Sequence, residues 1–266
     1  MKQVVSYLLS RLPKASDRST RIIPWSSPVP SFGDVSRSVV ATVGINPSNK
    51  EFVDDRDNEL AGEQRRFHTL SSLGLQTWSQ ACEAHYREIV RTCEGYFQSN
   101  PYDRWFRQLD FLISGTNFSY YSSMFSACHL DLVPFATACK WAELNTEHKV
   151  NLFSASGDSL GRLVRDSPLR VLVLNGSSVV SQFQKISETT LDASLKPTWK
   201  LPRPGGTGVA GYAYCGTITA LAGIKLNREV VVLGFNHNIQ SSFGVTSAVK
   251  ASIRRWISRS VQEALA

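Results

Sequence analysis

Residues 39–48 of this chain read Val-Val-Ala-Thr-Val-Gly-Ile-Asn-Pro-Ser, and they decide the fold. The apolar run 39–43 predicts a buried strand of a parallel sheet. Because Pro47 cannot donate a ladder hydrogen bond, the chain must turn there, which puts Asn46 on the loop at the carboxyl end of the strand. Open α/β sheets bind their ligands at such ends. Taken alone, an Asn-Pro pair is more typical of a simple turn, so the rest of the chain must decide whether this loop binds a ligand.

The remaining hydrophobic pattern alternates between strand-like and helical segments. Further buried strands are predicted at 123–133, 170–174 and 229–233, with a hairpin or edge strand at 211–224. Helices are predicted at 1–12, 64–73, 77–93, 100–115, 147–165, from 177 onward and at 245–264. This order predicts an α/β fold, specifically a three-layer α/β/α sandwich around a central, mostly parallel four-stranded sheet.

Pro- and Ser-rich composition at 13–34 predicts a connection along the surface. The expected division is therefore an N-terminal helix with its connection at 1–35, and a main domain at 36–266. The Pro- and Gly-rich segment 190–210 is predicted to be an insertion in that domain.

The composition indicates a cytoplasmic protein that acts without a cofactor. No apolar run is long enough to span a membrane, and the five cysteines form no Cys-x-x-Cys pair. We therefore expect reduced thiols, no metal site, no membrane partner and a monomer. The net charge of +7 suits a polyanion, and nucleic acid is the leading candidate.

Polar side chains lie at or near the ends of all four predicted parallel strands. They are Asn46, His129 with Asp131, Asn175, and the run Asn236-His237-Asn238. Because the carboxyl ends of parallel strands meet at one edge of a sheet, these groups are expected to converge. The first strand is not followed by a Gly-rich phosphate loop, and the sequence has no Gly-x-Ser-x-Gly elbow, which disfavours nucleotide-binding and hydrolase-triad sites.

Four segments in this order resemble the motifs of the uracil-DNA glycosylase superfamily. They are 44–48, in the form found in the mismatch-specific and single-strand-selective branches, 130–134, 171–176 and 234–242. The resemblance covers roughly residues 38–260 and implies a parallel sheet flanked by helices in a catalytic domain. It also implies double- or single-stranded DNA as partner, with the target base flipped out of the stack. The usual His-Pro-Ser of the last motif is here His237-Asn238-Ile239.

The resemblance assigns the catalytic roles to Asn46 and His237. Hydrolysis of an N-glycosidic bond develops positive charge on the sugar and negative charge on the departing base. Asn46 would hold the attacking water through its side-chain carbonyl, and a neutral His237 would donate a hydrogen bond to base O2. The alternatives are a turn asparagine and a surface histidine.

Two departures from the family pattern point to the target base. Where the uracil-specific branch has a tyrosine that excludes substituents at C5, Ser48 leaves space. Where the family has an asparagine that reads uracil, Asp131 as a carboxylate can only accept, which suits the N4 amino group of cytosine. The alternatives are a turn serine, and an aspartate that caps the loop before Pro134.

The remaining site residues follow from position. Ile45 lies within the first motif, Phe52 is a candidate for stacking on the base or for the core, and His129 shares the face of Asp131 as a base contact or a core histidine. DNA contacts are expected from the last motif and from the basic insertion, namely Asn238, Ile239, Gln240, Ser241, Lys200 and Arg203. A loop apolar residue is the alternative for Ile239.

These residues predict a monofunctional DNA glycosylase, a hydrolase that leaves an abasic site, because no lysine lies in the motifs. Removal of ordinary cytosine would destroy the host genome, so the expected target is a 5-substituted cytosine, such as the glucosylated hydroxymethylcytosine of some phages, in anti-phage defence. The alternatives are a repair enzyme for uracil or another damaged base, and a catalytically silent nucleic-acid-binding protein on the same fold.

Overall fold

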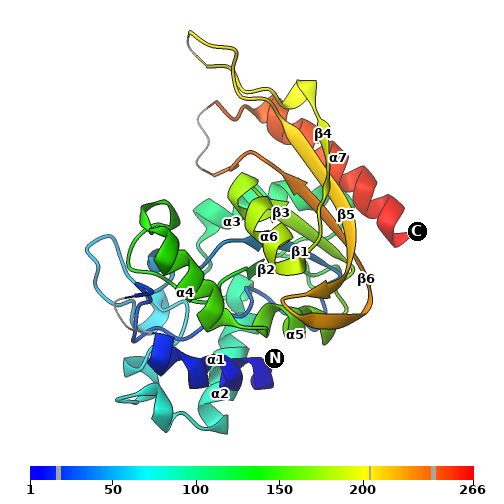
Figure 1. The fold of residues 1–266 in the computed structure, drawn as a ribbon. Coiled ribbons are helices and arrows are strands. Elements are labelled where there is room, and N and C mark those ends of the chain that lie inside the picture. The colour runs from blue at the N-terminus through cyan, green and yellow to red at the C-terminus, as the bar shows by residue number, and fades with distance from the viewer. Residues whose placement is uncertain (16–18, 204, 241–243) are drawn as a thin grey trace.

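A mixed six-stranded sheet forms the centre of the computed structural model (Figure 1), which describes residues 1–15, 19–203, 205–240 and 244–266. The strand order is β2-β1-β3-β6-β5-β4. The strands are β1 (Val40–Gly44), β2 (Ala127–Asp131), β3 (Val171–Asn175), β4 (Asp192–Leu195), β5 (Tyr212–Leu221) and β6 (Ile224–Phe235). The first four strands in this order pair in parallel, as predicted.

The prediction of four strands was wrong, because two antiparallel strands extend the sheet beyond β6. A tight turn joins β5 to β6, where Ala222 and Gly223 both have positive φ, the backbone that two-residue hairpins prefer. The segment 211–224, predicted as a hairpin or edge strand, holds β5, which forms a hairpin with β6, and β4 lies in the segment predicted as an insertion.

The α-helices of the described residues are α1 (Lys2–Ala15), α2 (Glu83–Glu94), α3 (Asp103–Ile113), α4 (Thr146–Ser156), α5 (Ser159–Arg165), α6 (Ser177–Ser187) and α7 (Ser247–Leu265). The helix predicted at 147–165 is interrupted at Gly157, whose φ of 55° ends α4. The helix predicted at 64–73 is instead two short 3-10 turns, η2 (Gly62–Gln64) and η3 (Ser71–Leu73).

Alternate residues of the parallel strands pack into two separate cores, one on each face of the sheet. Val40 and Leu233 point toward Phe106 of α3 and Ile253 of α7. Ala41, Leu172 and Val232 point toward Leu160 of α5 and Phe183 of α6. Helices therefore cover both faces of the sheet.

The N-terminal segment belongs to the first of these cores. Leu8 of α1 is fully buried there, and α1 lies beside α2 at the end of the molecule away from β4 (Figure 1). The following connection runs along the open edge of β2, where Phe32 and His129 exchange two backbone hydrogen bonds of 2.8 and 2.9 Å. No helix of the described residues is long and apolar enough to cross a membrane.

Candidate functional site

A cavity of about 70 Å³ lies at the carboxyl ends of β1 and β2, on the α3 face of the sheet. Four of the predicted site residues line it, namely Asn46, Ser48, His129 and Asp131. The parallel pairing of β1 with β2 brings them together, because it aligns Thr42 with His129 and Gly44 with Asp131. The convergence expected for the first two strand ends is therefore present.

Gly44 makes room for two of the polar side chains that line the cavity. A Cβ atom on this residue would overlap Oδ1 of Asp131 and lie 2.9 Å from Nε2 of His129. Only glycine lets both polar side chains lie across β1, which is a reason for this residue type in addition to the turn that follows.

Asp131 and His129 form the end of a buried chain of polar groups. His129 Nε2 lies 3.4 Å from Oδ1 of Asp131, and both side chains are almost fully buried. On its other side, Nδ1 of His129 lies 2.7 Å from the Thr42 hydroxyl, which contacts the hydroxyl of Tyr120. Burial raises the pKa of Tyr120 well above its usual value, so its hydroxyl keeps its proton.

This chain sets the tautomer of His129. If Tyr120 donates to Thr42 and Thr42 donates to Nδ1, every buried proton has an acceptor, and Nε2 carries the hydrogen that faces Asp131. His129 then orients the Asp131 carboxylate and leaves its second oxygen for a ligand.

Hydrogen bonds from its amino group fix the orientation of the Asn46 side-chain amide. Nδ2 donates to Thr137 Oγ1 at 3.0 Å and lies 3.1 and 3.4 Å from the carbonyl oxygens of Pro47 and Phe135. Thr137 donates its own hydroxyl to Cys139 O, so it must accept from Asn46. The oxygens of Thr137, Pro47 and Phe135 that surround this position can only accept here. The atom of Asn46 that faces them must therefore be the amino nitrogen and not the carbonyl oxygen. No described residue donates a hydrogen bond to Oδ1 of Asn46. The carbonyl oxygen is therefore available to a water molecule.

Ser48 lies at the mouth of the cavity and is exposed. Its hydroxyl accepts from the backbone of Lys50 at 3.2 Å and begins the 3-10 turn η1 (Asn49–Glu51). A small side chain at this position leaves the mouth open to solvent.

Sequence reasoning missed the carboxyl group of Glu51, which also lines the cavity and is 3% exposed. Burial raises its pKa to about 7 despite the opposing effects of the Tyr96 hydrogen bond and the Arg66 charge. The only sequence signal is an acidic residue directly before the apolar pair Phe52-Val53.

The aromatic walls of the cavity were also missed. Phe32 comes from the N-terminal connection, Trp105 and Phe106 from α3, and Tyr102 from the residue before it. Trp105 and Tyr102 are partly exposed, and the Trp105 ring meets His129 edge-on at 5.1 Å. Their helical spacing predicted only an apolar face, so the two exposed rings are the better candidates to contact a planar ligand.

Two predicted base-binding residues lie outside the cavity. Phe52 is 1% exposed and packs on Trp25 and Phe67, as expected for a core residue. Ile45 packs against the core on the opposite face of the sheet, because side chains alternate along the strand and its extension. It contributes a backbone carbonyl that accepts from Val133.

His237 is not a surface residue, and it does not line the cavity. It is 3% exposed, and its Nε2 donates to the backbone oxygen of Trp199 at 2.7 Å. Burial lowers its pKa, so the ring is neutral near pH 7 and its Nδ1 is an acceptor. Strand β3 separates β6, which leads to His237, from β1.

The residues after His237 form a compact segment beside the basic insertion. Ile239 is buried in the core, Asn238 is exposed, and Gln240 accepts from Asn175 Nδ2 at 3.0 Å. Lys200 is exposed next to Trp199, and the Arg203 charge contributes to lowering the pKa of His237. Ser241 lies outside the described residues.

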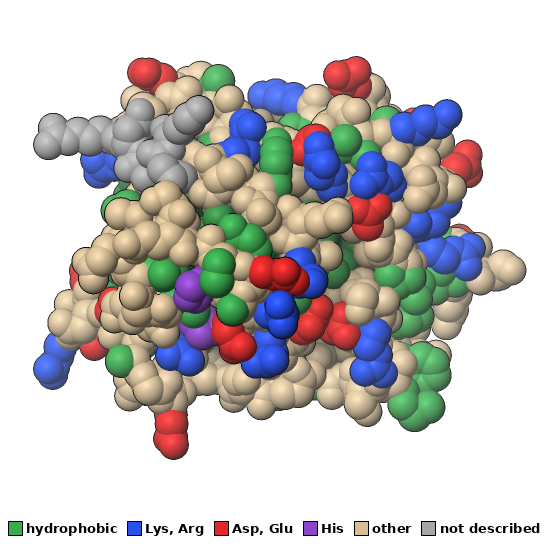
Figure 2. Space-filling view, turned by 90° about the horizontal axis from the view of Figure 1, so that it is seen from below, with side chains coloured by type: hydrophobic (Ala, Val, Ile, Leu, Met, Phe, Trp, Pro, Cys, Tyr) green, Lys and Arg blue, Asp and Glu red, His purple; other side chains and the backbone are tan. Residues whose placement is uncertain are grey.

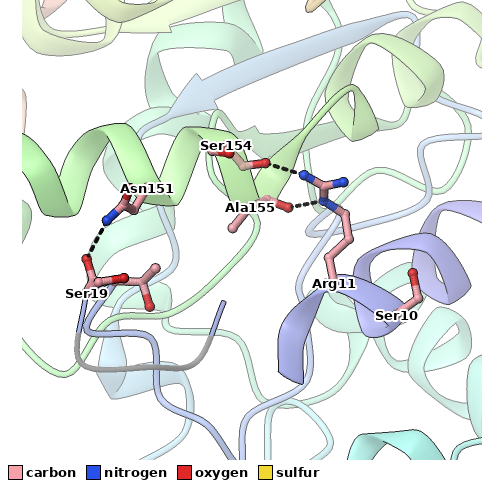
Figure 3. A pocket seen from close by; sticks show the side chains of 7 residues that line it. Ser10, Arg11, Ser19, Asn151, Ser154 and Ala155 are labelled. Atoms are coloured by element: carbon pink, nitrogen blue, oxygen red, sulfur yellow. Dashed lines mark hydrogen bonds between the residues drawn. The ribbon is translucent and has the colours of Figure 1, made fainter. Parts of the chain in front are cut away.

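A larger cavity of about 440 Å³ lies between α1 and α4 (Figure 3). Its charged group, Arg11, donates to the backbone oxygens of Ala155 and Ser154, and Asn151 donates to Ser19 O. The Arg11 contacts tie α1 to α4, and the Asn151 contact ties α4 to the segment after α1. The cavity therefore has the polar groups of a structural junction, and we do not assign it a reaction.

The face seen from the α1 and α2 end carries acidic and basic side chains intermixed (Figure 2). Oppositely charged side chains also pair within this part of the chain, since Lys2 of α1 lies 3.0 Å from the carboxylate of Glu83 of α2. This face therefore lacks the uniform positive charge expected of a surface that follows a phosphate backbone.

No protein-family model matches the chain, and no curated protein matches it significantly. Among the described residues, no group of three or more His, Cys, Asp and Glu side chains is arranged to hold a metal ion.

Proposed function

We propose that this protein is a monofunctional DNA glycosylase that hydrolyses the N-glycosidic bond of a flipped-out, 5-substituted cytosine and leaves an abasic site. The observation that carries the proposal is the meeting of Asn46 and Asp131 in one small, aromatic-walled cavity at the carboxyl ends of β1 and β2. We further propose that the four parallel strands are the sheet of the uracil-DNA glycosylase superfamily.

Each of the two residues has a chemical role in this proposal. The free Oδ1 of Asn46 accepts from the water that attacks the sugar carbon, and the fixed amide positions that water without acting as a strong base. Asp131, oriented by His129, accepts from the N4 amino group of the base. The neighbouring rings Tyr102 and Trp105 offer faces and edges to the pyrimidine.

The size of the cavity limits what enters it. A space of about 70 Å³ holds on the order of two water molecules at about 30 Å³ each, so it has no room for a substituent beside a pyrimidine ring. A hydroxymethyl or glucosyl group at C5 would therefore have to project through the mouth, past the exposed Ser48. This geometry favours a substituent that points out of the protein.

A second candidate, a catalytically silent nucleic-acid-binding protein, is favoured by His237. Its N–H donor is occupied by Trp199 O, and its ring lies outside the cavity. For His237 to stabilise the departing base, that hydrogen bond has to break and the ring has to approach the cavity when DNA binds.

An alkaline strand-cleavage assay tests these alternatives. Duplexes and single strands would contain cytosine, hydroxymethylcytosine, its glucoside or uracil at one position, and alkali would cut any abasic site. We expect cleavage at a 5-substituted cytosine. Cleavage at uracil alone would support a repair enzyme, and DNA binding without cleavage of any substrate would support the silent binding protein.

Among the described residues that line the cavity there is no lysine. The proposal therefore excludes a Schiff-base intermediate, and borohydride should trap no covalent protein–DNA adduct. A trapped adduct would show a lyase step and contradict the monofunctional assignment.

A further inference from the structure

Glu51 is a buried carboxyl group that the proposed mechanism does not yet use. Its Oε2 accepts from the Tyr96 hydroxyl at 2.8 Å, and that hydroxyl accepts in turn from the backbone N–H of Tyr102 at 2.9 Å. Among the described residues, no donor reaches Oε1, although the side chain is only 3% exposed and lines the cavity. One oxygen is thus anchored, and the other is left for a ligand.

The surroundings of Glu51 do not neutralise it by direct pairing. The guanidinium of Arg66 lies nearby but donates to the backbone oxygens of Lys50 and Asn100 at 2.6 and 3.0 Å. Asp131 faces the same cavity and opposes a second negative charge. Burial, with a smaller contribution from this repulsion, raises the pKa of Glu51 to about 7, so the acid form is well populated at neutral pH.

We propose that Glu51 is a further catalytic residue, which as a carboxylic acid donates its proton to ring nitrogen N3 of the cytosine held by Asp131. This inference rests on the proposed glycosylase function. A carboxylate at Asp131 and a carboxylic acid at Glu51 present an acceptor and a donor to the same cavity, which suits the N4 amino donor and the N3 acceptor of cytosine. Uracil presents the reverse order, with O4 accepting and N3 donating.

The proton balance of the step is simple. The bond between the sugar carbon and N1 breaks, its electron pair stays on the base, and the Glu51 proton moves to N3, so the base leaves neutral rather than as an anion. Water held by Asn46 adds to the sugar carbon and releases one proton to solvent. Glu51 regains a proton from solvent after the base departs, so no other reactant is required.

Donation by Glu51 also removes a difficulty of the site. The cavity contains a group that stabilises the leaving base even while His237 remains bound to Trp199 O. A proton donor in the cavity contributes about 10²–10⁴-fold to such a step.

The test measures kcat/KM for base release against pH, on the modified cytosine, for the wild type, Glu51→Gln, Tyr96→Phe and the exposed control Glu63→Gln. The wild-type value should fall about tenfold per pH unit above a pKa near 7, where the acid form is lost. Glu51→Gln, which cannot transfer a proton, should be slower by about 10²–10⁴-fold and lack this limb, whereas Glu63→Gln should match the wild type.

Tyr96→Phe separates Glu51 from other groups that titrate in this range. The charged or titratable groups around Glu51 are Tyr96, Arg66, Asp131 and His129, and histidine ordinarily titrates near this pH. Because the Tyr96 hydrogen bond lowers the pKa of Glu51, its loss should move the falling limb to higher pH. A limb that stays in place in Tyr96→Phe would assign it to another group and overturn the inference.

The two levels of the proposal fail differently. A wild type that releases base with a flat profile around pH 7, with a fully active Glu51→Gln, would overturn the role of Glu51 and leave the glycosylase intact. A wild type that releases no base from any substrate would overturn both. If Glu51→Gln does not fold, the wild-type profile and the Tyr96→Phe shift still decide.

Discussion

Gly44 and Asp131 are partners in the parallel pairing of β1 with β2, and the missing side chain of the one makes room for the carboxylate of the other. A Cβ at Gly44 would overlap Oδ1 of Asp131. The carboxylate can therefore occupy its place in the cavity only because residue 44 has no side chain. This relationship connects the motif that decides the fold to the group that we expect to read the base.

Gly44→Ala should therefore push Asp131 and His129 away from their positions. Both side chains are buried, so we expect a loss of about 1–3 kcal/mol of stability from overpacking, together with a large loss of base release. Thermal unfolding and strand cleavage measure the two effects. Gly206→Ala is the control, because a Cβ there meets open space and should change neither.

Asp131→Asn tests the assignment of residue to base. The amide can donate to uracil O4 and loses the carboxylate that accepts from cytosine N4, and a mismatched buried polar pair costs about 1–3 kcal/mol. We expect single-turnover release to fall on the modified cytosine by roughly tenfold to over a hundredfold and to rise on uracil. If the folded variant kept the wild-type ratio of the two rates, Asp131 would only cap its loop.

Asn46→Ala should lower base release by about two to four orders of magnitude, because the positioned carbonyl is lost. Thr137→Val removes the acceptor that holds the Asn46 amino group at 3.0 Å, so it should reduce the rate by a smaller factor. Asn151→Ala, beside the other cavity, is the matched control. DNA affinity should persist in all three, since phosphate contacts dominate it, and equal rates in all three would remove Asn46 from the mechanism.

Glu51 should make stability depend on pH. Its folded pKa of about 7 lies above the ordinary 4.5, so its contribution is fully present below pH 4.5 and is lost as the pH rises through 7. The shift corresponds to ~3 kcal/mol. Glu51→Gln should therefore unfold at higher urea than the wild type at about pH 8 and lose that advantage near pH 5.

His68 provides an internal check on that experiment. Burial lowers its pKa to about 4, so its contribution is lost as the pH falls from its ordinary 6.5, which is the opposite trend. It is present in both proteins, so the difference between Glu51→Gln and the wild type cancels it. A difference that does not change with pH would contradict the raised pKa of Glu51.

The basic insertion should contact phosphates if DNA approaches this edge of the sheet. Lys200→Ala is expected to reduce the slope of log affinity against log salt by about 0.9 on duplex DNA, the change for one phosphate contact. Lys185→Ala is the control, because it lies in the last turn of α6 and hence at the opposite end of the sheet. Equal slopes for the wild type and Lys200→Ala would show that Lys200 makes no phosphate contact and that DNA binds at another surface.

The parallel strands could be predicted because they are apolar runs that end at Gly, Pro or Asn, and such runs are buried on both faces. Strand β4 could not be predicted from the sequence, because all four of its residues are exposed and carry no hydrophobic pattern. The prediction of a helix at 64–73 was wrong. Phe67, Leu70 and Leu73 have helical spacing, but the backbone is already extended at Arg65, with a ψ of 130°, so the helix is interrupted after η2.

The candidate site could be predicted where it depends on strand register. Asn46, His129 and Asp131 meet because parallel strands align their ends. Glu51 and Trp105 depend instead on how η1 and α3 fold over those ends, which no local pattern encodes. The pairing of Asn46 with His237 stays a prediction, because strand β3 lies between the two strands that lead to them and His237 is absent from the lining of the cavity.

The hydrogen bond from His237 to Trp199 O makes two distant segments mechanically dependent on each other. Trp199 is also held by Ser252 of α7, at 3.1 Å from its indole nitrogen, and it is followed directly by Lys200. A displacement of the basic insertion therefore affects the hydrogen bond of the His237 imidazole, and a movement of the imidazole affects the insertion. By reciprocity, whatever frees the ring costs the insertion one anchor, so the positions of the ring and of the insertion are energetically coupled.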